Sequence, residues 1–158
     1  MKRIKDVMTA NIKFCYPHDD CAKVAKIMKE DNVGIVPVLA DKNNKSLIGV
    51  VTDRDICLGL AAQERDPRNV TVYECMSDMP VTCTPTDEVP KALELMTKYR
   101  VRRLPVIDAK GTLQGMVSLT DLAWKGDAPA EVLVEALKRM TEFSATRRNN
   151  RGKGKKAA

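Results

Sequence analysis

The chain contains an internal duplication that covers most of its length. The matching segments are 7–9 with 75–77, 27–28 with 95–96 and 33–38 with 101–106, all at a shift of 68 residues, and 49–55 with 115–121 at a shift of 66. Two residues are lost from a polar loop, Asp41 to Ser46 in the first copy and Asp108 to Thr112 in the second, where a change of length costs little. The sequence therefore predicts two copies of one structural unit.

Each copy begins with the same predicted elements. A short extended segment, 12–15 or 81–84, leads to a helix for which Asp19 or Asp87 is the predicted N-cap. The helix has apolar residues at the i, i+3, i+4, i+7 spacing of one buried face, at Cys21, Val24, Ala25 and Met28 in the first copy and at Val89, Ala92, Leu93 and Met96 in the second.

Two short β-rich runs and a second helix complete each copy. The predicted strands are 35–39 and 47–51 in the first copy, and 104–107 and 113–117 in the second. The closing helix is expected from about Arg54 to Ala62 in the first copy and from near Leu119 in the second. Another amphipathic helix is expected after Pro129, as far as about Met140.

A β-α-β-β-α unit of this size exposes one apolar sheet face, so two copies are expected to cover each other. The predicted fold class is α/β (α+β), with two tandem β-α-β-β-α repeats packed sheet to sheet about a pseudo-twofold axis. The predicted boundaries are 1–67 for repeat 1, 68–126 for repeat 2, 127–144 for a C-terminal amphipathic helix and 145–158 for a basic, disordered tail. Crevices between the repeats are the candidate binding sites.

The net charge of +6 comes from the end of the chain. Residues 147–158 hold six Lys and Arg and no acidic residue, whereas the preceding residues carry 21 basic and 21 acidic side chains. Such a tail is expected either to be a solvated extension or to bind nucleic acid or an anionic surface nonspecifically. Aromatic residues make up only 4% of the chain, which leaves few rings for stacking on single-stranded bases.

In both copies a buried strand leads directly into Ser/Thr-x-x-Asp at the start of a helix, Thr52 to Asp55 and Ser118 to Asp121. This pattern is close to a capping box, in which the hydroxyl and the carboxylate satisfy the free amides of the first turn. Its recurrence opposite a Pro-containing strand also places a carboxylate, a hydroxyl and helix amides at an inter-repeat crevice. Those groups suit the ribose diol and phosphate of a nucleotide.

These motifs resemble the cystathionine-β-synthase (CBS) domain pair, or Bateman module, over residues 4 to about 125. Gly49 to Ile56, Gly59 to Ala62 and Tyr99 to Val106 are similar to stand-alone bacterial CBS-pair proteins of the hypoxic-response type. The resemblance implies a regulatory, sensor-like protein that binds AMP, ADP, ATP or a related adenosine-containing ligand between its repeats. No required cofactor is expected beyond that regulatory nucleotide.

The resemblance also implies two sets of binding residues. In the stronger site, Asp121 would hold the ribose, Ser118, Thr120, Arg102 and Arg103 the phosphate, and Ile12, Lys13, Val33, Gly34 and Ile35 the adenine. The pseudo-symmetric site would use Thr52, Arg54 and Asp55, with Val81, Thr82 and Val101 beside the base. Gly34 and Ile35 stand there in place of the arginine pair, so this site is expected to suit polyphosphates less.

The cysteines and the single histidine give weaker signals. Cys15, His18 and Cys21 have a spacing that would reach a metal ion, but a closed site needs a fourth ligand, from Cys83, Asp19 or Asp20, so no metal site is assigned. Cys21 and Cys57 are expected to be core thiols, and a redox role for Cys15 and Cys83 is a further hypothesis. All five cysteines are expected to be reduced.

The remaining predictions concern activity, location and partners. No enzyme activity is expected, because His18 belongs to no recognisable catalytic motif and Asp55 and Asp121 are placed to bind. The start of the chain lacks the apolar stretch of a secretory signal and no stretch would span a bilayer, which favours the cytoplasm. The resemblance also implies a homodimer, for which the amphipathic stretches 56–61 and 132–140 are the candidate interface, and a signal would pass to a separate effector protein. The alternative is a ligand-free dimeric scaffold whose basic tail binds nucleic acid or an acidic protein.

Overall fold

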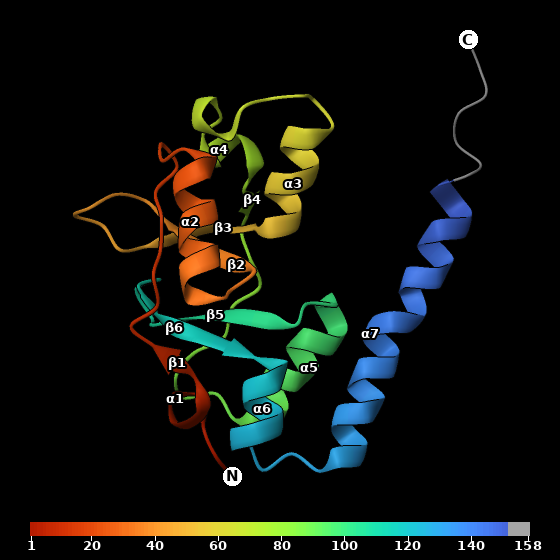
Figure 1. Cartoon of the computed structure of the whole chain (residues 1–158). Helices are drawn as coiled ribbons and strands as arrows, with labels where there is room; N and C mark the ends of the chain where they lie inside the picture. The colour runs from red at the N-terminus through yellow and green to blue at the C-terminus, as the bar shows by residue number, and fades with distance from the viewer. Residues whose placement is uncertain (152–158) are drawn as a thin grey trace.

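The computed structural model describes the backbone of residues 1–151 and the side chains as far as residue 141. It consists of two halves stacked on each other, each with a three-stranded sheet and covering helices (Figure 1). The elements are α1 (Ile4–Val7), β1 (Thr9–Ala10), α2 (Cys21–Asp31), β2 (Ile35–Leu39), β3 (Leu47–Thr52), α3 (Asp53–Ala61), η1 (Pro67–Asn69), α4 (Val72–Cys75), β4 (Ser77–Asp78), α5 (Val89–Tyr99), β5 (Arg103–Ile107), β6 (Leu113–Ser118), α6 (Leu119–Lys125) and α7 (Ala130–Arg151).

The two sheets are built alike, and each contains one short strand from the other repeat. Strand β1, which precedes α2 of the first repeat, lies in the second sheet, and β4, which precedes α5 of the second repeat, lies in the first sheet. One sheet has the order β2-β3-β4 and the other β1-β6-β5, with all neighbours antiparallel. In both hairpins the register shifts at equivalent positions, after Val38 and after Val106. The predicted α/β fold with two matching repeats is therefore confirmed, and the chain crosses between the halves twice.

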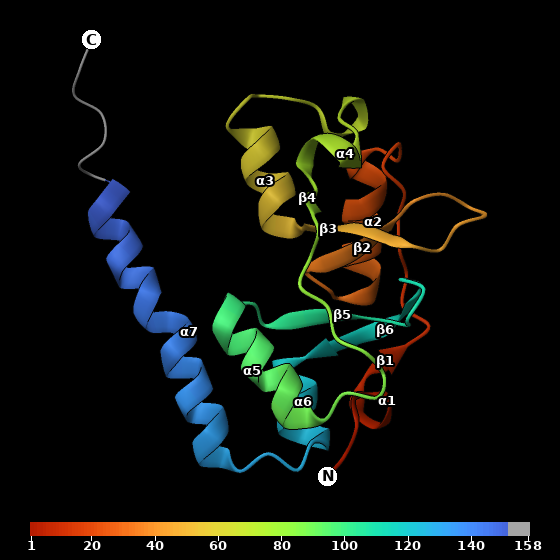
Figure 2. The ribbon, with the colours of Figure 1, turned by 180° about the vertical axis from the view of Figure 1, so that it is seen from behind.

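The short helices α1 and α4 directly precede β1 and β4, the strands that pair with the other repeat, and lie in the same half as these strands. Ile4 and Val7 of α1 are fully buried in the core of the second half, where they pack with residues such as Leu104 and Leu122. Val72 of α4 is buried in the core of the first half with Val24 and others. Figures 1 and 2 both show α1 beside α6 and α4 close to α2. Residues 1–10 thus contribute to the second core and 70–78 to the first.

The extended segments before the long helices make only single parallel bridges, Cys15 with Val38 and Cys83 with Val106. The predicted helix caps were wrong by one residue. Asp20, not Asp19, is the N-cap of α2 and accepts a hydrogen bond from Lys23 N. Glu88, not Asp87, is the N-cap of α5. Asp19 and Asp87 instead stabilise the preceding turns, because their carboxylates accept from the amides of Tyr16 and Thr84.

The buried faces of the long helices are confirmed with one exception. In α5 all four predicted residues are buried, whereas in α2 Ala25 is exposed and Ile27 packs partly against the core. Helix α3 begins at Asp53 and α6 at Leu119, next to the predicted starts. Helix α7 packs along α5 and continues to Arg151, beyond 144 (Figure 2). The predicted disordered tail, 145–158, thus begins within this helix, and its residues 152–158 fall outside the described residues.

The hairpin loops also join the two halves. Leu47 N donates to Gly111 O at 3.0 Å, and Leu113 N donates to Lys45 O at 3.3 Å. None of the helices within residues 1–151 is both long and apolar enough to cross a membrane.

Candidate functional site

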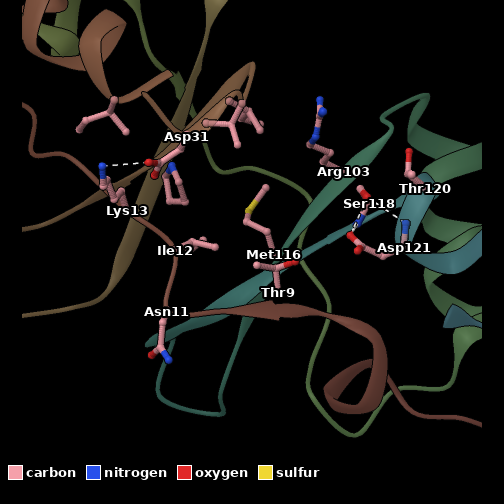
Figure 3. Close-up of a pocket in the computed structure, with 14 residues that line it drawn as sticks. Thr9, Asn11, Ile12, Lys13, Asp31, Arg103, Met116, Ser118, Thr120 and Asp121 are labelled. Carbon is pink, nitrogen blue, oxygen red and sulfur yellow. Dashed lines mark hydrogen bonds and ion pairs between the residues drawn. The ribbon is translucent and has the colours of Figure 1, made fainter. Parts of the chain in front are cut away.

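A cavity of about 440 Å³ lies between the halves at the first predicted site (Figure 3). Polar groups stand at both of its ends and apolar side chains lie between them. Ser118, Thr120 and Asp121 form one end and Lys13 and Asp31 the other, as Figure 3 shows. The full lining is Thr9, Asn11, Ile12, Lys13, Ile27, Asp31, Val33, Ile35, Pro37, Arg103, Met116, Ser118, Thr120 and Asp121.

The Asp121 end is organised by the capping box of α6. Ser118 donates to Asp121 Oδ2 from its backbone amide at 2.9 Å and from its hydroxyl at 2.6 Å, and Asp121 N donates to Ser118 Oγ at 3.1 Å. Lys125 Nζ lies 3.0 Å from Asp121 Oδ1, one helical turn further on. The Asp121 side chain is only 18% exposed, so its carboxylate is held in one orientation at the cavity wall.

These contacts favour the ionised form of Asp121. Partial burial opposes ionisation, but the hydrogen bonds from Ser118 and the neighbouring Lys125 outweigh it and hold the pKa of Asp121 below its ordinary value. An ionised carboxylate only accepts hydrogen bonds, and its two oxygens offer about four acceptor positions. Asp121 is therefore an acceptor for a donor group in the cavity.

The opposite end contains an ion-pair cluster. Lys13 Nζ lies 2.9 Å from Asp31 Oδ1 and 3.3 Å from Glu30 Oε2. Hydrogen bonds to Asp31 and then Glu30 raise the pKa of Lys13 above its usual value. Because Asp31 and Lys13 both line the cavity, this end offers a carboxylate and an ammonium close together.

A second cavity of about 600 Å³ is related to the first by the internal repeat. Thr52 and Asp55 occupy the places of Ser118 and Asp121, and Val81 and Val101 those of Lys13 and Val33. The lining is Gly34, Ile35, Val50, Thr52, Asp53, Arg54, Asp55, Ser77, Met79, Pro80, Val81, Arg100, Val101, Arg102, Arg103 and Pro105. Ile35 and Arg103, which are equivalent to each other, line both cavities.

The two carboxylates differ in their surroundings. Asp55 Oδ2 accepts from Thr52 N at 3.0 Å, and Asp55 N donates to Thr52 Oγ1 at 3.1 Å, as in the first site. The position of Lys125 is taken by Gly59 in the first copy, so the i+4 ammonium is missing from α3. Both predicted capping boxes are therefore present, and the carboxylate at Asp121 also has a cationic partner in Lys125.

The structure distributes the predicted binding residues between the cavities. In the first are Ile12, Lys13, Val33, Ile35, Arg103, Ser118, Thr120 and Asp121. In the second are Thr52, Arg54, Asp55, Val81 and Val101, as predicted. Gly34 and Arg102 were assigned to the first site but line the second, and Thr82 lines neither cavity. Four arginines thus border the second cavity, which is the reverse of the charge distribution expected from the sequence.

Several lining residues were not anticipated from the sequence. In the first cavity they include Thr9, Asn11, Asp31 and Met116. Thr9 belongs to the repeated Met-Thr/Ser motif and is equivalent to Ser77 of the second cavity, so the repeat itself carried a signal for both. Met116 carried the same signal, because it is equivalent to Val50 of the second cavity. Asp31 had no such signal, because its equivalent Tyr99 does not line the second cavity.

The cysteines and His18 do not converge. Cys15 Sγ points to Pro37 O, whereas Cys21 Sγ points to Thr71 O and to Cys75 Sγ. The two thiols of the predicted metal motif therefore have different partners. Within the described part of the chain, no three His, Cys, Asp or Glu side chains are grouped so as to hold a metal ion. Cys57 is exposed, so its prediction as a core thiol was wrong; Cys21 is buried as predicted.

Comparison with known proteins decides the family. The family model described as "CBS domain" matches residues 4–62 and 72–125, which are the two repeats. The chain belongs to the CBS domain family. Among its CBS relatives, protein YlbB of Bacillus subtilis is 38% identical over 124 residues, covering 78% of this chain and 81% of YlbB. Hypoxic response protein 1 of Mycobacterium tuberculosis is 30% identical, covering 78% of this chain and 84% of that protein.

Solved structures agree with the fold. The crystal structure of Hypoxic Response Protein I with two coordinated zinc ions has a TM-score of 0.70 and 28% identity, covering 81% of this chain and all of that chain. The crystal structure of CBSX2 in complex with AMP has a TM-score of 0.67 and 23% identity, covering 78% of this chain and 94% of that one. The CBS pair is thus the shared architecture.

Proposed function

We propose that this CBS pair is a regulatory protein, without enzyme activity, that binds an adenosine-containing ligand between its repeats. The observation that carries the proposal is the ionised Asp121 carboxylate, fixed at the wall of a cavity that also contains an arginine and helix-start hydroxyls. A cavity of about 440 Å³ is of the size that small-molecule ligands occupy. A protein of the same fold, CBSX2, contains AMP.

The arrangement of the first cavity suits the parts of a nucleotide in order. Asp121 would accept hydrogen bonds from the two ribose hydroxyls, since it is ionised and held in place by Ser118. Thr120 is exposed at the same end, and Arg103 adds a charge that pairs well with phosphate. The Ser118 hydroxyl already bonds to Asp121, so its role is to orient that carboxylate.

The base would occupy the apolar middle and the far end. Ile12, Val33 and Ile35 offer apolar contact, and Asp31 is a carboxylate acceptor placed where an exocyclic amino group would donate. Lys13 is already engaged by Asp31 and Glu30 and would be a weak phosphate ligand. This orientation directs the phosphate toward Arg103 and the second cavity.

The second cavity is proposed as the site for more highly charged ligands. Arg54, Arg102 and Arg103 border it, against Asp53 and Asp55. Bidentate arginine contacts favour phosphate groups, and several arginines together favour a polyphosphate. ADP or ATP is therefore the expected occupant there, and AMP or an uncharged adenosine derivative in the first cavity.

The signal is proposed to pass to a separate effector protein through a homodimer. Within 56–61, Ile56 and Leu60 are buried in their own half, which leaves Leu58 as the large apolar side chain of that helix that a partner would contact. Trp124 is its equivalent on α6 and is 83% exposed, and Val132, Val134 and Leu137 of α7 are also exposed. These side chains are the expected dimer surface.

Thermal unfolding in the presence of AMP, ADP, ATP, NAD and S-adenosylmethionine tests the proposal. A ligand at 100 times its Kd stabilises the folded state by about 2.7 kcal/mol, which for a chain of this size raises Tm by about 5–10 °C. The Asp121→Asn variant should lose the response to ligands of the first cavity, since asparagine keeps an acceptor for Ser118 but not the charge. Asp55→Asn is the matched control and should retain that response.

Indifference of the wild-type protein to every adenosine compound would contradict the proposal and favour the ligand-free scaffold. That alternative predicts salt-sensitive RNA binding that disappears when residues 147–158 are deleted. Circular dichroism of both aspartate variants separates a lost ligand site from a lost fold.

A further inference from the structure

We propose that Cys21 and Cys75 form a thiol pair that closes to a disulfide on oxidation, clamping the inter-repeat linker onto the first half. Cys21 opens α2 and Cys75 ends α4, and their sulfurs lie 3.8 Å apart although the residues are 54 positions apart in the chain. This inference is independent of the ligand proposal, because neither thiol lines either inter-repeat cavity.

The backbone around the pair is already held in register. Asp20 and Thr71 form an antiparallel bridge, and Cys21 N donates to Val70 O at 2.9 Å. Cys21 Sγ donates toward Cys75 Sγ and also lies 3.7 Å from Thr71 O. Forming the bond therefore requires the two sulfurs to approach within a segment that is already aligned.

The internal repeat supplies a comparison for this pair. The residues equivalent to Cys21 and Cys75 in the second half are Val89 and Val7, which are 2% and 0% exposed. Two apolar side chains without thiol chemistry therefore fill the same positions in the other core. Packing alone therefore does not require a thiol at either of these positions, yet the first half has a cysteine at both.

The two thiols differ in access, which gives each a role. Cys21 is fully buried, and burial together with its bond to Cys75 raises its pKa. Cys75 is partly exposed and lines a small pocket of about 250 Å³ with Arg54, Arg65 and Gly59. Gly59 has no side chain to cover the thiol, whereas a Cβ atom added at this position would lie 3.5 Å from Cys75 Sγ. A small oxidant therefore reaches Cys75 first.

The chemistry is a two-step exchange with a low-molecular-weight disulfide such as oxidised glutathione. The Cys75 thiolate attacks one glutathione sulfur, forms a mixed disulfide and releases one glutathione thiolate. Cys21 then gives its proton to solvent and attacks Cys75 Sγ, which releases the second glutathione thiolate. Two protein thiols are oxidised to one disulfide and one glutathione disulfide is reduced to two thiols.

The experiment uses the full chain with Cys57→Ser, which removes the exposed thiol. After incubation with oxidised glutathione, intact mass should fall by two hydrogen atoms, and proteolysis should yield one peptide pair joining Cys21 to Cys75. Closing a loop of this length should raise Tm by about 5 °C or more, reversibly with dithiothreitol.

The matched control adds Cys75→Val, which reproduces the valine found at Val7. It should fold, form no cross-link and show no oxidant-dependent change in Tm. A persistent glutathione adduct on Cys75 without the link to Cys21, or a link that forms only after denaturation, would overturn the proposal.

Discussion

The Thr9 carbonyl oxygen lies 2.5 Å from the point that a Cβ atom on Gly115 would occupy. The equivalent pair in the other half is Ser77 and Gly49, at 2.8 Å. At both places a short strand from the other repeat pairs with the strand that leads into the Thr/Ser-x-x-Asp motif. Thr9 pairs with Met116, and Ser77 pairs with Val50. The glycine that precedes each of these motifs is therefore required for the close approach of a strand from the neighbouring repeat.

The first prediction follows from this contact. Gly115→Ala should displace β1, because a Cβ at that distance from a backbone oxygen forces the strands apart. We expect the free energy of unfolding to fall by about 1–3 kcal/mol, the range typical of overpacking, as measured by urea denaturation. Ligand binding in the first cavity should weaken as well, since Thr9 and Ser118 lie on these strands.

Gly59→Ala is the control for this prediction. Its Cβ would meet only Cys75 Sγ at an ordinary 3.5 Å, within helix α3. Alanine is favoured over glycine inside a helix by about 0.5–1 kcal/mol, so this variant should be as stable as the wild type or more so. Equal stability of the Gly115→Ala and wild-type proteins would show that β1 does not depend on the close contact.

The repeat and its apolar spacing predicted the architecture correctly, because each element carries its own local pattern. The capping boxes at Thr52 and Ser118 could also be predicted, since they depend on residues three positions apart. The pairing of β1 and β4 with the other repeat's strands could not be predicted, because each is only two residues long and exposed and so carries no apolar alternation. The placement of Arg102 in the second cavity depends on how the halves meet, which local patterns do not encode.

The second prediction concerns acid stability. The pKa of Asp121 is lowered in the folded state, and such a carboxyl stabilises the fold fully above its unfolded pKa and ceases to do so as pH falls through its folded pKa. We expect the difference in unfolding free energy between the wild type and Asp121→Asn to be constant near neutral pH. It should shrink below about pH 4, where the unfolded carboxyl begins to bind protons.

Urea denaturation of both proteins across that pH range measures the difference. Lys125→Met provides a partial control, because it removes one of the groups that lower the pKa and leaves the Ser118 hydrogen bonds in place. Its difference from the wild type should be smaller and should shrink over the same range. A difference for Asp121→Asn that did not vary with pH would mean that its charge does not contribute to stability.

The third prediction separates the two cavities through their arginines. Arg103 lines both cavities, whereas Arg102 lines only the second. Arg103→Ala should therefore weaken the binding of phosphate-bearing ligands at both sites, whereas Arg102→Ala should weaken it only at the second. The loss of one charge-assisted hydrogen bond corresponds to roughly a tenfold increase in Kd.

Isothermal titration with AMP and ATP in the Asp55→Asn and Asp121→Asn backgrounds assigns each change to one cavity. The Kd of adenosine, which has no phosphate, should be nearly the same in both arginine variants as in the wild type. Arg102 occupies the position of Gly34, and Arg103 that of Ile35, so the first repeat has no arginine at these two positions. The contrary outcome is that Arg102→Ala weakens AMP binding in the Asp55→Asn background as strongly as Arg103→Ala does. The two arginines would then act together at the first cavity, and the proposed division of ligands between the cavities would be wrong.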